Sequence, residues 1–343
     1  MVMVYKQQAN LSNEEKLDNL YDEHKVPLFV RTQLDYLKTA SGKIQYLYTL
    51  VEYFNFLINE RLISVNSISE VTDESLAKVP GNQCNKYFDY LKEKGNADST
   101  IQTKIKKISS FYTKCIDDDE LVIERNPIKR VKKKQFSEIV KVKDKKMVGD
   151  NDINKLLENV EYRRRYSDYR TRDLAIIHLF LGSGIRESEM AGLDLEDLVL
   201  DVENPYITVI RKGYLKLKSQ VYISNKAKEY LEMWLNDRRY FVAHDVQALF
   251  LNKYGYRMRE LAIYDMITTN SPDIVYSDPT TKEDVTYKIT PHMLRHVYAT
   301  KLAEATGNDI ATLKKQMGHA SIKTTETYTH VTNKNLGIIG GLM

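Results

Sequence analysis

The sequence predicts a mostly α-helical protein that carries a small β-sheet and is divided into two domains. A length of 343 residues is enough for two compact domains. Apolar residues recur at a helical period through residues 26–118, whereas two short β-rich runs occur only later, at residues 206–210 and 220–223. A strongly basic segment lies between these two parts, which suggests a linker.

The N-terminal part predicts a polar arm followed by a helical bundle. We expect residues 1–25 to form a loose arm or a short helix, and residues 26–120 to form four or five packed helices. One predicted face consists of Ile44, Leu47, Tyr48, Val51, Phe54 and Ile58. The helix that opens at Asp98 and Ser99 should direct inward Ile101, Ile105, Ile108, Tyr112 and Cys115.

Residues 121–148 are predicted to be an extended basic linker. The pair Asn126 and Pro127 breaks the helical pattern, and the run that follows includes Lys132, Lys133 and Lys134. A plain, solvated linker explains this composition equally well. The alternative is a strap that lies along the phosphate backbone of a nucleic acid.

The second domain is expected at residues 149–331, with helices around the short β-runs. Residues 172–180 should form a buried helix, in which His178 is a core or interface histidine. Further helices are expected at 227–240 and 256–268, and a surface loop or short hairpin at 271–287. The tail, residues 332–343, is apolar enough to suggest that it docks on another surface.

Composition excludes several classes of protein. No apolar run approaches the roughly 18–20 residues that span a bilayer, so we expect no membrane segment. The two cysteines, Cys84 and Cys115, lie far apart without histidine partners, so we expect neither a metal site nor a disulfide framework. A reducing cytoplasm is therefore the expected location. The net charge of +4 is too small to identify a partner by itself.

His292, Arg295, His319 and Tyr328 lie within forty residues of one another near the C-terminus. His292 and Arg295 are three apart on one predicted helix, and His319 and Tyr328 follow. Each residue alone is more often structural than catalytic. Together they suit attack on a phosphate diester, because a phenol can act as nucleophile, a guanidinium can bind phosphate oxygens and an imidazole can move a proton.

The same residues carry a family resemblance. The run from His292 to His296, then Gly318 and His319, then residues 324–331 around Tyr328, resembles the C-terminal signature of the tyrosine recombinases, the phage integrase and Xer superfamily. Residues 184–189 (GIRESE) resemble a second family motif, in which the arginine is catalytic. The resemblance implies an N-terminal core-binding domain and a C-terminal α+β catalytic domain.

The resemblance also implies a role for each matching residue. Tyr328 would attack a DNA phosphate to form a 3′-phosphotyrosine, while Arg186 and Arg295 grip the non-bridging oxygens. His292 would help to take the tyrosine proton, and His319 would donate to the phosphate. Lys212 would be the general acid for the leaving 5′ oxygen, with Lys216 and Lys218 as competitors for that role. Glu189 and His296 would support this set by position.

The resemblance implies that double-stranded DNA sites are the partners and that a homo-tetramer acts on two of these sites. It also implies a reaction that needs neither a metal ion nor ATP. An accessory protein or partner recombinase is a further possibility, and the tail would dock in trans. In this setting Lys104, Lys106 and Lys107 are expected to contact DNA, although a solvated helix face explains them as well. Three alternatives stay open: a type IB topoisomerase, a non-catalytic DNA-binding protein and a structural protein that binds no DNA.

Overall fold

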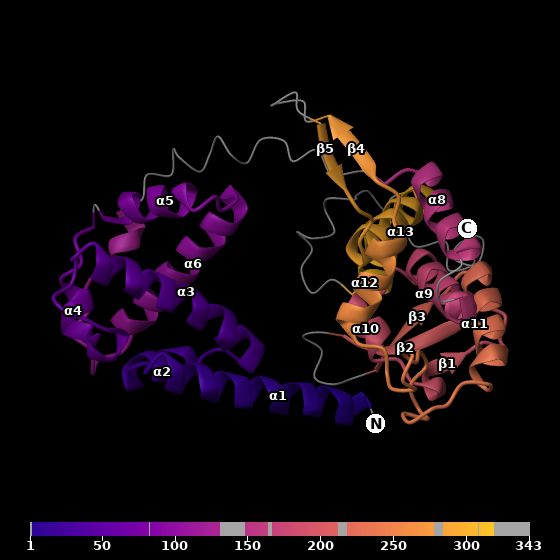
Figure 1. The fold of residues 1–343 in the computed structure, drawn as a ribbon, viewed down its shortest axis with the longest axis horizontal. Helices are drawn as coiled ribbons and strands as arrows, with labels where there is room; N and C mark the ends of the chain where they lie inside the picture. Colours follow the sequence, from indigo (N-terminus) through magenta and orange to yellow (C-terminus); the bar gives the residue numbers. More distant parts are fainter. Residues whose placement is uncertain are drawn as a thin grey trace. The chain divides into compact units, whose positions relative to one another are not determined.

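The chain divides into two compact units, Met3–Lys143 and Asp144–Met343, with Met1–Val2 grouped with the second. Figure 1 shows the fold of the computed structural model. The structure describes residues 2–81, 83–130, 148–163, 167–211, 218–277, 284–307 and 309–318. Each unit has its own hydrophobic core, and the two are described separately below.

The first unit is helical throughout its described residues. Its helices are α1 (Val2–Glu23), α2 (Leu28–Leu34), α3 (Ala40–Asn59), α4 (Asp73–Ala77), α5 (Gln83–Glu93) and α6 (Asp98–Ile116), with 3₁₀ turns η1 (Ile68–Glu70) and η2 (Pro127–Arg130). Side-chain caps explain where two of them begin. Thr39 accepts a hydrogen bond from the backbone N–H of Gly42 at the start of α3, and Thr72 does the same for Ser75 at the start of α4.

Aromatic side chains fill the centre of this unit. The Tyr53 ring lies 5.1 Å from that of Tyr87, at 71°, in the edge-to-face arrangement that aromatic pairs prefer. All five residues predicted to face inward from α6 are buried. Tyr48 was predicted wrongly, because it is 47% exposed. Its position widens the apolar stripe of α3 beyond the part that its neighbours cover.

Both ends of the predicted bundle differ from expectation. The arm is a helix of 22 residues, α1, whose Leu17, Leu20 and Tyr21 belong to the core of this unit. At the other end Ile123 and Ile128, which the sequence placed in the linker, are buried in the same core. The packed part of the unit therefore continues beyond residue 120, to residue 128.

The second unit surrounds a small sheet with helices. The helices are α8 (Asp150–Tyr162), α9 (Arg170–Ser183), α10 (Glu187–Ala191), α11 (Asn225–Arg238), α12 (Glu260–Asn270), α13 (Pro291–Ala305) and α14 (Ile310–Met317), with 3₁₀ turns η3 (Ser167–Tyr169) and η4 (Leu195–Asp197). The strands β1 (Leu198–Val199), β2 (Tyr206–Ile210) and β3 (Lys218–Tyr222) form an antiparallel sheet in that order. The hairpin of β4 (Ile274–Ser277) and β5 (Asp284–Tyr287) forms a second sheet.

Helix α9 is the centre of this unit, because it packs against both α11 and α13 and is buried from Arg172 to Ser183. Of the two settings predicted for His178, core or interface, the structure shows a core position, with 8% of the residue exposed. The His178 ring stacks on Tyr230 with 4.0 Å between centroids, and burial lowers the pKa of His178 to about 4. His178 is therefore neutral at physiological pH.

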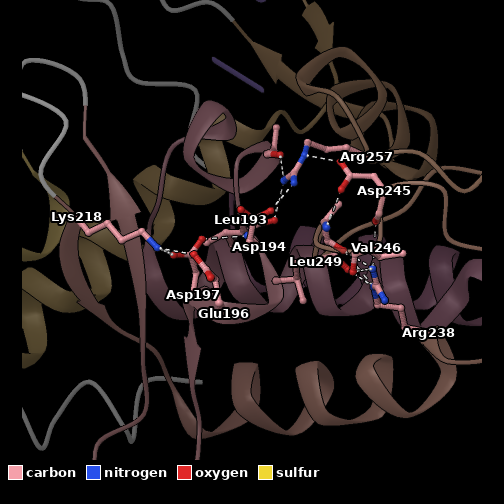
Figure 2. A network of polar contacts seen from close by, with 12 residues as sticks. Leu193, Asp194, Glu196, Asp197, Lys218, Arg238, Asp245, Val246, Leu249 and Arg257 are labelled. Atoms are coloured by element: carbon pink, nitrogen blue, oxygen red, sulfur yellow. Dashed lines mark hydrogen bonds and ion pairs between the residues drawn. The ribbon is translucent and has the colours of Figure 1, made fainter. Parts of the chain in front are cut away.

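A network of arginines and aspartates binds the connecting segments to this core. Figure 2 shows Arg257 between Asp194 and Asp245, and Arg238 among backbone carbonyls. Arg257 also donates to the Leu193 carbonyl at 2.9 Å. These contacts correct the predicted helix at 256–268. Helix α12 begins only at Glu260, since Arg257 pairs in an isolated β-bridge with Leu251.

No helix in the described part of the chain combines the length and the apolar character that crossing a bilayer requires.

Truncation of Leu231 should destabilise the second unit. Leu231 is fully buried in α11, so Leu231→Ala should lower its free energy of unfolding by about 2–5 kcal/mol. The only tryptophan in the sequence, Trp234, is buried in the same helix, and its fluorescence during urea denaturation reports this unit alone. Met233→Ala is the matched control, since Met233 is 44% exposed and its truncation should leave the midpoint nearly unchanged. Equal shifts for the two variants would contradict this packing.

Candidate active site

Arg186 is oriented by a buried carboxylate. It is the N-cap residue of α10, and its backbone N–H donates to Glu189 Oε2 at 2.9 Å. Its Nη1 donates to Glu189 Oε1 at 2.8 Å, and the Glu189 side chain is only 2% exposed. A cation is disfavoured at a helix N-terminus, so Glu189 offsets the cost of placing the guanidinium there. The arrangement leaves Arg186 held at two points and still 31% exposed.

Arg295 lies on the first turns of α13, which begins at Pro291 after the N-cap Thr290. The side chain is almost fully buried. Its Nη1 donates to the Gly184 carbonyl, and its Nη2 donates to the Met317 carbonyl at 2.6 Å. Arg295 therefore connects the end of α9 to the end of α14.

The two arginines meet at the C-terminal end of α14. Arg186 Nη2 donates to the Gly318 carbonyl at 3.0 Å, next to the Met317 carbonyl that accepts from Arg295. Gly318 has φ +61°, which ends the helix in the left-handed conformation. The predicted motif residues at 186 and 295, far apart in the sequence, are thus brought together immediately before residue 319.

His292 and His296 form a hydrogen-bonded pair on α13. Their Nε2 atoms are 2.9 Å apart, so one ring donates and the other accepts. Partial desolvation of the ring, together with the charges of Arg295 and Arg186, lowers the pKa of His292. His292 is therefore neutral near pH 7 and can accept a proton.

Four predicted residues lie outside the described residues: Lys212, Lys216, His319 and Tyr328. Lys218, the other candidate for the general-acid role, is described. Figure 2 shows it reaching toward Asp197 and Glu196. The Lys218 Nζ is 2.8 Å from Asp197 Oδ1 and 3.2 Å from Glu196 Oε1. The pKa of Lys218 is raised, chiefly by the hydrogen bond to Asp197. These contacts hold Lys218 protonated at the end of the β2–β3 ladder where it pairs with Ile210.

The lysines predicted to bind DNA differ in their surroundings. Lys104 pairs with Glu52 at 2.7 Å, and Lys107 donates to the Gln45 carbonyl at 3.0 Å. Burial, followed by the charge of Lys104, lowers the pKa of Lys107. Lys106 is exposed between them. The linker lysines Lys132, Lys133 and Lys134 lie outside the described residues.

Sequence reasoning missed Arg211. Its Nη2 donates to the Gln316 carbonyl at 2.6 Å, one position before the two carbonyls that accept from Arg295 and Arg186. The signal was the alternation of β2, in which Ile207 and Val209 are buried and Arg211 continues the same face.

Within the described ranges, no group of three or more His, Cys, Asp or Glu side chains is placed to hold a metal ion.

Comparison with known proteins agrees with this geometry. The model of the phage integrase family matches residues 146–335, more than half of the chain. Tyrosine recombinase XerS from Streptococcus pyogenes serotype M5 (strain Manfredo) is 31% identical over 323 residues, covering 84% of this chain and 86% of the relative. XerS from Streptococcus mutans serotype c (strain ATCC 700610 / UA159) is 30% identical over 358 residues, covering 93% and 95%.

Solved structures share the fold at lower identity. XerH site-specific recombinase in its post-cleavage complex with palindromic difH substrate has a TM-score of 0.63 and 20% identity, covering 86% of this chain and 77% of that chain. The Tn1549 transposon integrase in complex with a circular intermediate DNA has a TM-score of 0.62 and 21% identity, covering 92% and 95%. The chain belongs to the phage integrase family of tyrosine recombinases, and it is a site-specific recombinase.

The pKa of His292 should depend on the charge of Arg186. Arg186→Met removes one of the cations that lower this pKa, so the pKa should rise toward the ordinary value of about 6.5. Arg186→Lys keeps the charge, and there the pKa should stay low. The measurement is an NMR titration of the histidine rings, with His292→Gln used to assign the resonance. Identical pKa values in the Met and Lys variants would contradict the electrostatic cause.

Proposed function

We propose that this recombinase cuts and rejoins duplex DNA through a 3′-phosphotyrosine intermediate formed on Tyr328. The observation that carries the proposal is the meeting of Arg186 and Arg295 on adjacent carbonyls at the end of α14, ten residues before Tyr328. The relatives named tyrosine recombinases, matched over most of both chains, support it as well. The solved neighbours are complexes with DNA, in which XerH is bound to palindromic difH substrate and the Tn1549 transposon integrase to a circular intermediate DNA.

The chemistry is a transesterification. The Tyr328 phenol oxygen attacks the phosphorus, the bond to the 5′ bridging oxygen breaks, and that oxygen takes up a proton. The phosphodiester is replaced by a phosphotyrosine of similar energy, so the reverse attack by a 5′ hydroxyl rejoins a strand. This step requires charge neutralisation and proton transfer, which arginine, histidine and lysine side chains supply.

Arg186 and Arg295 are assigned to the non-bridging oxygens of the scissile phosphate. A guanidinium carries five N–H donors, and Glu189 and the Gly318 carbonyl occupy one side-chain donor each of Arg186. The partial exposure of Arg186 leaves the group open to a ligand. Charge that develops in the pentacoordinate transition state would be stabilised by both cations.

The proton-transfer roles go to three other residues. Neutral His292, supported by its hydrogen bond to His296, would help to take the tyrosine proton. His319 follows Gly318 directly and would donate to the phosphate. Lys212 would protonate the leaving 5′ oxygen. Lys218 is a poor candidate for that step, since Asp197 and Glu196 already engage its ammonium.

The two units are proposed to grip DNA from a helical core-binding domain and a catalytic domain, with the lysines of residues 121–148 between them. Lys106, which is exposed, is the favoured contact on α6, because Lys104 and Lys107 have partners within the unit. Phosphate contacts of this kind give salt-dependent affinity with little sequence preference.

The proposed assembly is a homo-tetramer on two DNA sites, exchanging strands pairwise, with the tail (residues 332–343) docked in trans. A partner recombinase or an accessory protein could take part in the same complex. The reaction would take place in the cytoplasm, where the DNA of a bacterial cell or a mobile element lies. The two XerS relatives favour an Xer-like role.

A nicked suicide duplex tests the nucleophile. The wild-type protein should become covalently attached to the cut strand, and mass spectrometry should place the adduct on Tyr328. Tyr328→Phe should bind the duplex with an unchanged Kd and form no adduct, because the ring lacks its nucleophilic oxygen. Tyr240→Phe is the matched control, since Tyr240 is 80% exposed in the same unit.

An adduct on another tyrosine would overturn the assignment. A second assay with two sites on separate duplexes distinguishes recombination from topoisomerase-like relaxation: exchanged products are expected, and relaxation without exchange would contradict the proposal.

Paired arginine substitutions test the general acid. Arginine retains the positive charge but holds its proton too tightly to act as an acid. Lys212→Arg should slow cleavage by roughly 10²- to 10⁴-fold, and replacing the 5′ bridging oxygen with sulfur should restore the rate, since a thiolate leaves without protonation. Lys218→Arg keeps the ion pairs with Asp197 and Glu196 and should cleave at nearly the wild-type rate. Rescue by sulfur in the Lys218 variant instead would transfer the role to Lys218.

A further inference from the structure

Arg211 is a buried cation that has no role in the proposed chemistry. It follows β2 directly and is only 3% exposed. A buried charged side chain requires compensating contacts, because removing a guanidinium from water is costly. The contacts that Arg211 makes show what it does in the site.

The first contact is with the main chain of α14. Arg211 Nη2 donates to the Gln316 carbonyl at 2.6 Å. The last carbonyls of a helix lack partners within the helix and carry its partial negative charge, so a cation is favoured there. Arg211, Arg295 and Arg186 thus donate to three successive carbonyls, those of Gln316, Met317 and Gly318.

The second contact is steric. A methyl group on Gly318 would lie 1.9 Å from Arg211 Nη1 and 2.3 Å from Arg211 Cδ. Only a residue without a side chain lets the guanidinium lie this close to the backbone, and the φ of +61° at Gly318 also favours glycine. The guanidinium therefore fits against the turn that leads to residue 319.

The Gln316 side chain joins the same turn to the sheet. Its Oε1 accepts from the Tyr222 N–H at 3.3 Å, and its Nε2 donates to the Tyr222 carbonyl at 2.6 Å. The end of β2 holds the backbone of Gln316 through Arg211, while the end of β3 holds its side chain. The end of α14 is thereby fixed to both strands of one hairpin.

We propose that Arg211 is a positioning residue for strand cleavage: it fixes the end of α14 so that Arg186 and Arg295 meet the scissile phosphate in the productive geometry. This inference rests on the proposed function, in which those two arginines bind the phosphate. Arg211 itself is buried and does not touch DNA. Its loss changes the rate of the chemical step and leaves DNA binding unchanged.

Single-turnover cleavage of the nicked duplex at saturating protein separates positioning from stability. A variant that only unfolds lowers the amplitude of cleavage, because fewer molecules are active, and keeps the rate constant. A variant that misplaces the arginines keeps the amplitude and lowers the rate constant. Arg211→Met should lower the rate constant by roughly 10- to 100-fold, the size expected for a displacement of about 1 Å. The Kd for the duplex should stay within about twofold of wild type.

Two further variants keep the test decisive if Arg211→Met folds poorly. Arg211→Lys retains a charged donor for the Gln316 carbonyl and should recover part of the rate constant. Gly318→Ala keeps the arginine at position 211, but the added methyl group would displace the Arg211 guanidinium. This variant should therefore slow cleavage as Arg211→Met does.

Arg238→Met is the matched control. Arg238 is also buried in this unit and donates to backbone carbonyls, including Ala248 at 2.6 Å, but none of these belongs to α14. It should lose stability and keep the wild-type rate constant. Lowered amplitude with a normal rate constant in Arg211→Met, or an equal slowing in Arg238→Met, would overturn the proposal. Failure of the wild-type protein to form any adduct on Tyr328 would instead refute the proposed function.

Discussion

The site depends on three guanidinium groups that share the C-terminal end of one short helix. Three like charges at one place repel each other, and they need a compensating negative potential. The carbonyls at the end of α14, which have no acceptor role within the helix, supply part of this potential. The buried Glu189 carboxylate beside Arg186 supplies more. Guanidinium groups match the geometry of phosphate oxygens, so a cluster of them suits a phosphate diester.

The positions of these groups follow from how the second unit packs. Gly184 caps α9 in the left-handed conformation and gives its carbonyl to Arg295. A methyl group there would lie 2.2 Å from Tyr298 Cδ1 and 3.0 Å from Met317 Sδ, so α13 and α14 approach the α9 terminus as closely as glycine allows. Small shifts in this packing would be transmitted to the arginines, because close-packed interiors leave little room for adjustment.

Periodicity was enough to predict most helices and both strands of the hairpin, since each has one face in a core. It failed where tertiary contacts decide. The polar sequence of α1 gives little sign of a helix, and among its described side chains the buried ones are Leu17, Leu20 and Tyr21. The start of α12 was predicted too early because the contacts of Arg257 with distant aspartates leave no local pattern. Motif residues predicted roles for Arg186, His292 and Arg295, whereas finding Arg211 would have required the alternation of β2 to be continued past the last apolar residue.

The acceptors for the three arginines are main-chain oxygens, and this has an evolutionary consequence. Every amino acid brings the same carbonyl, so mutation at residue 317 changes the packing around the arginines and leaves their acceptors in place. Met317 illustrates this, because the group that accepts from Arg295 is its backbone carbonyl and not its side chain. Gln316 and Gly318 lack this freedom, because the Gln316 side chain bonds Tyr222 and a side chain at residue 318 would displace Arg211. Binding to the peptide backbone thus lets the side chain at residue 317 vary while the three guanidinium groups keep their acceptors.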